Sequence, residues 1–324
     1  FKAADVASLT SDAATVTVSN VAGGTLTVAS IESLALVSTG AANNMTLTAA
    51  AANTLTVTGD QAITFNTANA VAETVDASAL TGVLTMTTGN ANATTITSGT
   101  GNDAITVTPT AAVVETISTG AGNDTVTYTA NLGTADVLNG GDGTDVLAGT
   151  SALLTAMTAA TATNRTNFET IRVNNDLAAT LTVANVQAAG VGTVRLNTGA
   201  DTGTGVTGLA GTLNVQLGGP LEGLFTMTDT GSATDDVANI SSVSTTSQDL
   251  GAGFAITSTG YETLSISTTV TGAAIKQDYG AIIVTPDTGG TATLNFTGTN
   301  IADIGGTITA DVIDASGMTA RALT

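Results

Sequence analysis

The sequence predicts an all-β protein whose strands stack as a parallel β-solenoid of the β-roll or β-helix type. Short segments that alternate apolar and polar residues recur about every ten residues. A Gly-x-Gly-x-Asp pattern also occurs three times at a fixed interval of 21 residues, which fits two strands per coil. Because alternation alone does not fix how strands pair, a β-sandwich remains an alternative.

The alternating pattern covers most of the chain. It predicts strands at residues 15–18, 25–28, 45–48, 54–57, 63–65 and 83–86 and around Ile96. After the Gly-Asp repeats it predicts strands at 170–173, 180–183, 193–197, 212–217, 224–228, 255–257, 263–267, 282–285, 293–297 and 307–313. We therefore divide the chain into solenoid coils (1–98), Gly-Asp repeats (99–149) and a continuation of the solenoid with irregular insertions (150–324).

Two segments break the pattern. Residues 153–166 contain no glycine and little alternation, so we expect a short helix or an excursion from the solenoid. Residues 229–253 are rich in Asp and Ser, and we expect a solvated loop there, with a loose cation site as the alternative. The phrase at 75–85 returns at 313–324, where the chain stops. This suggests a fragment of a longer protein.

The three Gly-Asp turns are the candidate metal site. Glycine permits positive φ, so carbonyls in a tight turn can converge, and aspartate adds a hard oxygen ligand. An inward-facing aliphatic residue follows each aspartate two positions later. Residues 140–148 match the Ca²⁺-binding nonapeptide G-G-x-G-x-D-x-U-x in full, whereas the copies at 99 and 120 lack its first glycine. Three Gly/Asp/Asn turns without a metal are the alternative.

The candidate ligands come from these turns and from one further aspartate before a strand. They are Gly99, Gly101, Asn102, Asp103, Gly120, Gly122, Asn123, Asp124, Asp136, Gly140, Gly141, Asp142, Gly143, Thr144 and Asp145.

The charge balance limits the possible partners. The formal net charge is −20, and only six residues are basic, without forming a cluster. This argues against nucleic-acid binding and against a polybasic membrane anchor, and it favours divalent cations. No apolar run approaches the roughly 20 residues that a membrane span needs.

The chain contains no His and no Cys, which excludes Ser-His-Asp triads, HExxH zinc sites and thiol nucleophiles. A carboxylate pair, or a Ca²⁺-assisted sugar lyase with an arginine base, is not excluded by residue type. Scarce aromatic residues leave little to stack on sugar rings, and we expect no enzymatic activity.

A second repeat places glutamate before a strand. Five of the six glutamates stand in a Glu-[Thr/Ser]-aliphatic frame, namely Glu32, Glu73, Glu115, Glu169 and Glu262. A charge at a strand start that blocks edge pairing is one interpretation, and a cation ligand is the other.

The run GTGND…VVETISTGAGNDTV…LNGGDGTDVLAGT…NFETIRV resembles the repeat region of bacterial RTX-type surface-layer (S-layer) proteins. The DAS-x-L-T-G and Glu-Thr-aliphatic phrases are similar to that family too. The specific motif covers about 50 residues, and the diffuse resemblance covers the whole chain.

The resemblance implies a Ca²⁺-bound, right-handed β-solenoid that assembles into a lattice on the bacterial cell surface. It assigns Ca²⁺ to the glycines and to Asp103, Asp124, Asp136 and Asp145, with backbone carbonyls contributed at Asn102, Asn123 and Thr144. It also implies type I secretion, and partners that are copies of the chain, other surface-layer subunits and cell-surface polysaccharide reached through another domain. An adhesin or an extracellular filament subunit is the alternative.

Overall fold

The computed structural model describes residues 12–49, 51–66, 73–89, 93–109, 113–244, 249, 253–270 and 276–319. These residues form an all-β parallel β-solenoid of about 13 turns, with about 5% helix. The strands of the described residues pair in parallel, which confirms the predicted fold class and excludes the β-sandwich for this part of the chain. The chain divides into two compact units, Phe1–Ala148 with Thr163–Phe168 and Gly149–Ala162 with Glu169–Thr324.

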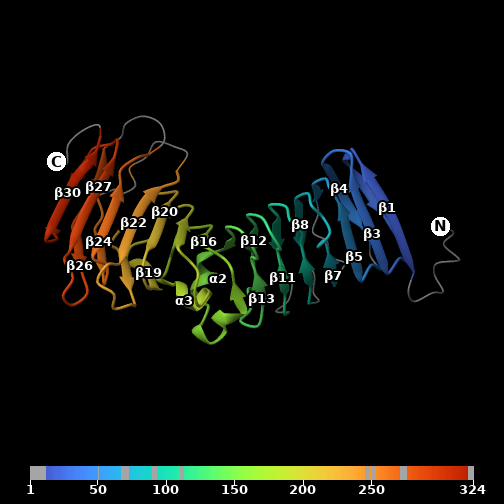
Figure 1. Ribbon diagram of the computed structural model, residues 1–324, viewed down its shortest axis with the longest axis horizontal. Coiled ribbons are helices and arrows are strands. Elements are labelled where there is room, and N and C mark those ends of the chain that lie inside the picture. Colours follow the sequence, from blue (N-terminus) through green and yellow to red (C-terminus); the bar gives the residue numbers. More distant parts are fainter. Residues whose placement is uncertain are drawn as a thin grey trace. The chain divides into compact units, whose positions relative to one another are not determined.

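In the first unit, successive strands alternate between two sheets (Figure 1). The first sheet contains, in order, β1 (Ala13–Ser19), β3 (Ser33–Thr39), β5 (Thr54–Gly59), β7 (Thr74–Asp76), β9 (Thr95–Thr97), β11 (Thr116–Ser118), β13 (Val137–Asn139) and β15 (Arg165–Thr166). The second contains β2 (Ala22–Thr27), β4 (Asn43–Thr48), β6 (Ile63–Phe65), β8 (Leu84–Thr88), β10 (Ala104–Val107), β12 (Thr125–Tyr128) and β14 (Val146–Gly149). Each coil therefore supplies one strand to each sheet.

The core of this unit lies between the two sheets. Ile105, Val126 and Leu147 occupy equivalent positions on three successive coils, and each is at most 1% exposed. Leu138 is likewise fully buried on the facing sheet. The aliphatic residue two positions after each repeat aspartate thus faces inward, as predicted, and its burial stabilises the stack through the hydrophobic effect.

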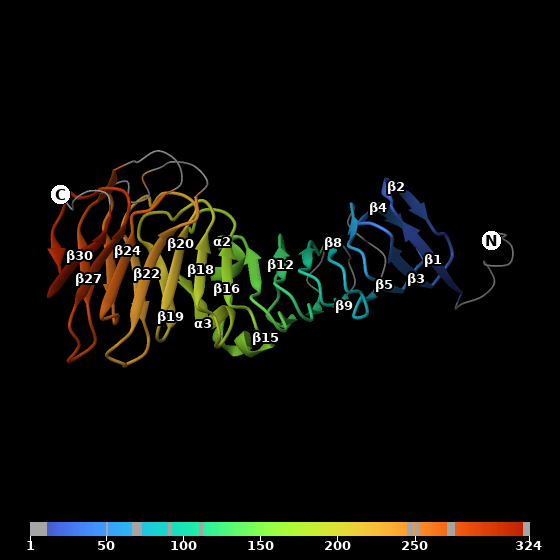
Figure 2. The same cartoon turned by 45° about the horizontal axis from the view of Figure 1, so that its top comes forward.

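In the second unit the main sheet contains β16 (Thr170–Val173), β18 (Thr193–Leu196), β20 (Leu213–Leu217), β22 (Val237–Ser242), β24 (Thr263–Ser267), β27 (Thr293–Gly298) and β30 (Val312–Met318), side by side (Figure 2). A second sheet contains β17 (Leu181–Thr182), β19 (Thr204–Leu209), β21 (Phe225–Asp229), β23 (Ile256–Thr259), β26 (Ile282–Thr285) and β29 (Ile308–Thr309). Strands β25 (Gln277–Tyr279) and β28 (Ala302–Ile304) form a third pair.

The expected helix is present at the start of the irregular insertion. Helix α2 (Ser151–Thr155) begins after Thr150, whose side chain accepts a hydrogen bond from the Leu153 backbone N–H and so caps the helix. The 3₁₀ helix η1 (Ala159–Asn164) follows. A third helix, α3 (Val183–Val186), occupies the end of the strand predicted at 180–183 and shortens it. None of the helices in the described ranges is long and apolar enough to cross a membrane.

The prediction for residues 229–253 was wrong over its first half. Strand β22 pairs with β20 on one side and with β24 on the other, so this stretch contributes a coil. Asp229 and Asp236 are buried rather than solvated. The strand was not predicted because it is only six residues long (VANISS) and the residues before and after it are rich in Ser and Asp, which are typical of turns.

Candidate metal site in the Gly-Asp turns

The glycines of the repeat are required because successive coil corners stack backbone on backbone. Gly120 and Gly141 adopt φ of +86° and +90°. A Cβ on Gly120 would lie 2.1 Å from the carbonyl oxygen of Gly99, and one on Gly141 would lie 1.9 Å from that of Gly120. Both the dihedral angle and the space therefore exclude a side chain, whether or not a metal is bound.

The repeat aspartates form a ladder along one corner of the first unit. Oδ1 of Asp124 accepts the backbone N–H of Asp103 at 2.6 Å, and Oδ1 of Asp145 accepts that of Asp124 at 2.7 Å. Oδ1 of Asp103 accepts the N–H of Leu84 at 2.7 Å. Each aspartate thus satisfies a buried N–H of the preceding coil, which sequence reasoning did not anticipate.

The asparagines form a second ladder on the outside of the same corner. Oδ1 of Asn102 accepts the N–H of Asn123 at 2.8 Å, and Oδ1 of Asn123 accepts the N–H of Thr144 at 2.9 Å. All three side chains are exposed. These bonds run in the opposite direction to those of the aspartates, because each side chain reaches forward to the next coil. Two of the three positions that were predicted to supply a backbone carbonyl to Ca²⁺, Asn102 and Asn123, thus supply a side-chain acceptor to the next coil.

Two of the buried carboxylates, those of Asp103 and Asp124, form no ion pair within the described residues. Asp103 and Asp124 are at most 1% exposed. Burial raises the pKa of both carboxyls above the ordinary value, and in Asp124 the charge of Asp103 adds to this effect. Within the described ranges neither forms an ion pair, and Oδ2 of Asp124 is buried without a hydrogen bond. Such groups favour either a bound proton or a bound cation.

Asp136 belongs to a different corner. It precedes β13 on the first sheet, whereas Asp103, Asp124 and Asp145 precede strands of the second sheet. Its Oδ1 accepts the N–H of Glu115 at 3.0 Å. Burial raises the pKa of Asp136, and the positive charge of the buried Arg165 opposes that shift. Asp136 thus already has a cation beside it.

Sequence reasoning did not include Arg165 in this site. The available signal was its rarity, because it is one of only six basic residues in the chain.

The two acidic residues of the last turn, Asp142 and Asp145, differ in their exposure. Asp142 is exposed, and its backbone N–H donates to the carbonyl of Gly120 at 2.8 Å, whereas Asp145 is fully buried. A Cβ on Gly140 would lie 1.9 Å from the carbonyl oxygen of Asn167. The full nonapeptide thus places one carboxylate inside the corner and one outside it.

The atoms that the turns could offer as metal ligands fit a hard cation in part. The candidate ligand atoms in these turns are all oxygens, which suits Ca²⁺. Asp124 also has a buried carboxylate oxygen without a hydrogen bond. No group of three acidic side chains able to hold a metal occurs in the described part of the chain. A Ca²⁺ ion here would therefore take one or two carboxylates and draw its other ligands from backbone carbonyls and water.

The glutamate frame has a structural role that neither interpretation anticipated. Oε2 of Glu32 accepts the N–H of Asp12 at 2.8 Å, and Oε2 of Glu115 accepts that of Thr94 at 3.1 Å. Glu262 accepts the N–H groups of two residues through its two carboxylate oxygens. These glutamates close coil corners in the same way as the repeat aspartates, since each accepts an N–H from the coil before it.

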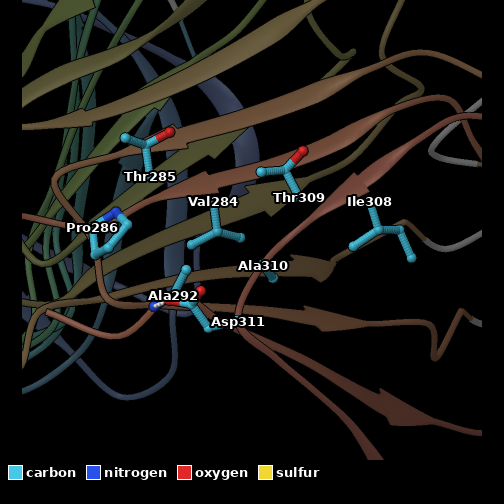
Figure 3. A pocket seen from close by; sticks show the side chains of 8 residues that line it. All are labelled: Val284, Thr285, Pro286, Ala292, Ile308, Thr309, Ala310 and Asp311. Carbon is cyan, nitrogen blue, oxygen red and sulfur yellow. Dashed lines mark hydrogen bonds between the residues drawn. The ribbon is translucent and has the colours of Figure 1, made fainter.

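A hollow in the second unit has a volume of about 450 Å³. Figure 3 displays its lining, which comes from β26, β29 and the connections beside them: Val284, Thr285, Pro286, Ala292, Ile308, Thr309, Ala310 and Asp311. Asp311 is the one acidic residue of this lining, and its Oδ2 accepts the N–H of Ala292 at 3.0 Å. Its carboxylate therefore closes a corner here as well.

No family model, no curated protein and no solved structure matches this chain.

Proposed function

We propose that this chain is a structural subunit of an extracellular bacterial surface layer, a β-solenoid that Ca²⁺ stabilises and that assembles with copies of itself. The stack of buried carboxylates in the Gly-Asp turns carries the proposal. Asp103 and Asp124 lie on adjacent coils, are desolvated, and have no basic partner in the described ranges. A divalent cation between coils would offset their repulsion.

The residues that would hold the ion are those of the Gly-Asp corner. An ion would take one or two of the carboxylates of Asp103, Asp124 and Asp145, and the glycine corners would supply backbone carbonyls. The ion would provide positive charge between coils that the chain itself scarcely provides, since it has 26 acidic and six basic residues. Binding to the folded coils alone would make folding depend on the Ca²⁺ concentration.

The surface-layer role is supported by the resemblance of the repeats, by the solenoid, and by the composition. A solenoid is quasi-one-dimensional, and its surface offers long, repetitive faces for lattice contacts. The partners proposed are copies of the chain and other surface-layer subunits, with cell-surface polysaccharide reached through a different domain.

Electron microscopy of the purified chain in Ca²⁺ tests the assembled form. Ordered two-dimensional sheets that disperse in EGTA are the expected result. Fibres or single particles would overturn the lattice proposal and favour an adhesin or a filament subunit with the same solenoid. Release of unsaturated sugars from an acidic polysaccharide would overturn the structural role altogether.

A further inference from the structure

A second cluster of buried acidic groups lies in the second unit, away from the Gly-Asp repeats in sequence. Asp229 is the last residue of β21, and Asp236 precedes β22, so the two stand at either end of one coil corner. The next coil places Tyr261 in the stacked corner between β23 and β24, which pair with β21 and β22. Gly260 lies directly against Asp229, because a Cβ there would be 3.0 Å from the Asp229 Cβ.

Backbone hydrogen bonds fix this corner. Oδ2 of Asp229 accepts the N–H of Gly231 at 2.8 Å. The N–H of Asp236 donates to Oε2 of Glu262 at 3.0 Å, and the N–H of Glu262 donates back to the carbonyl of Asp236 at 3.0 Å. The fold therefore holds the side chain of Asp229 and the backbone of Asp236 in place.

Three polar atoms at this corner are buried without a hydrogen bond within the described ranges. They are Oδ1 of Asp229, Oδ2 of Asp236 and the phenol oxygen of Tyr261. The three residues are 8%, 5% and 0% exposed. A buried polar group without a partner is costly, so three close together call for a ligand.

The charges at the corner point to the sign of that ligand. Burial is the main cause that raises the pKa of Asp236, and the neighbouring carboxyls of Asp229, Glu262 and Asp235 raise it further. Burial is also the main cause that raises the pKa of Tyr261, and the charges of Asp229 and Asp236 add to that shift. Glu262 already uses both carboxylate oxygens as acceptors. Within the described residues the ion pairs join Lys276 to Asp278 and to Asp303, and none involves this corner.

We propose that Asp229 and Asp236 bind a divalent cation, Ca²⁺, beside the phenol of Tyr261. The donor atoms are all oxygen, which selects hard cations over zinc or copper. Ca²⁺ suits an irregular corner better than Mg²⁺, because Mg²⁺ demands near-octahedral geometry. Backbone carbonyls and water complete the coordination, since Asp229 and Asp236 each offer one buried oxygen that is free of hydrogen bonds. This site goes beyond the proposed function and does not depend on Ca²⁺ in the Gly-Asp turns.

Terbium luminescence tests the site on the full chain. Tb³⁺ occupies Ca²⁺ sites and emits when a nearby tyrosine absorbs and transfers energy. The chain has three tyrosines and no tryptophan, so the donor can be assigned by substitution. Tyr261→Phe should remove a tyrosine-sensitised component that Ca²⁺ displaces more readily than Mg²⁺. The control Tyr279→Phe, in another coil, should retain that component.

Calorimetric titration with Ca²⁺ gives the second readout. Asp236→Asn should bind one Ca²⁺ fewer than the unaltered chain while keeping its circular dichroism. Asp124→Asn should leave the Tyr261-dependent luminescence intact, so failure of Ca²⁺ binding in the Gly-Asp turns would be seen separately.

Two results would overturn the proposal. One is luminescence that Tyr261→Phe does not reduce. The other is folded Asp236→Asn that binds as many Ca²⁺ ions as the unaltered chain, which would mean that the two carboxyls share a proton instead. If Asp236→Asn does not fold, the Tyr261→Phe comparison decides alone.

Discussion

The backbone N–H of Asp103 donates to Oδ1 of Asp124, 21 residues later, at 2.6 Å. The same bond joins Asp124 to Asp145 one coil further on. The aspartate of the repeat therefore connects its own coil to the corner of the preceding coil by a hydrogen bond, independently of any metal. This relationship separates two contributions to stability, the hydrogen bond and the bound cation, which experiments can measure one at a time.

The first prediction concerns Asp124. Asp124→Ala removes the acceptor of a buried N–H, so in EGTA it should cost about 1–3 kcal/mol of unfolding free energy. In Ca²⁺ the loss should be larger still, because a ligand is also removed. Asp60→Ala is the matched control, since Asp60 is an exposed turn residue outside the repeats. Equal losses for the two variants in Ca²⁺ would contradict the assignment of the metal to these turns.

The second prediction concerns the stacked glycines. Gly120→Ala should destabilise the fold by at least about 1–3 kcal/mol, because the residue has positive φ and a Cβ would meet the carbonyl oxygen of Gly99. At Gly192 a Cβ meets nothing within 4 Å, so Gly192→Ala should be close to neutral. Urea unfolding of both variants checks this difference. Similar unfolding midpoints would argue against the tight stacking of corners.

The third prediction concerns the glutamate frame. Glu262→Ala leaves the N–H groups of Asp236 and Asp287 without their acceptor, and each loss should cost about 1–3 kcal/mol. Glu222 is exposed and is the one glutamate outside the frame, so Glu222→Ala should change stability little. Thermal unfolding in EGTA compares the two without a metal. A neutral Glu262→Ala would contradict the corner-closing role.

The fourth prediction is a reversal of pH dependence. Burial raises the pKa of Asp103, Asp124 and Glu115 in the folded chain. Folding thus favours their protonated forms, so in EGTA the stability that they contribute is greatest below the ordinary carboxyl pKa and is lost as the pH rises through the raised values. Under the proposed Ca²⁺ binding, the ionised carboxylates are the ligands, so acid should weaken binding.

Melting curves between about pH 4 and pH 8 check this reversal. The difference between the melting temperatures in Ca²⁺ and in EGTA should grow with pH. A difference that is constant or that shrinks as the pH rises would contradict carboxylate ligation.

The sequence was sufficient to predict the solenoid and the inward aliphatic positions, because alternation and a 21-residue spacing report directly on strands and coils. It did not predict β19, whose Gly205 and Gly208 interrupt the alternation, or β22, which lies in an Asp- and Ser-rich stretch. Both strands form because neighbours on each side supply the pairing.

The sequence was sufficient to predict which types of residue form the candidate site, but not which hydrogen bonds and charged neighbours they have. The spacing of Asp103, Asp124 and Asp145 places them on one corner, and the structure brings them together there. The same spacing does not reveal that each carboxylate accepts an N–H of the previous coil, or that Asp136 lies on another corner beside Arg165. Such contacts depend on which sheet a strand joins, and that follows from tertiary packing alone.

The most direct test of the central claim is thermal unfolding followed by circular dichroism in millimolar Ca²⁺, in EGTA, and in Mg²⁺ as the control. Ca²⁺ that binds only the folded coils should raise the melting temperature progressively with its concentration. Mg²⁺ should produce a much smaller rise, because its geometry is more demanding. The same melting temperature in Ca²⁺, Mg²⁺ and EGTA would contradict the account and leave the Gly-Asp turns as a hydrogen-bonded stack without a metal.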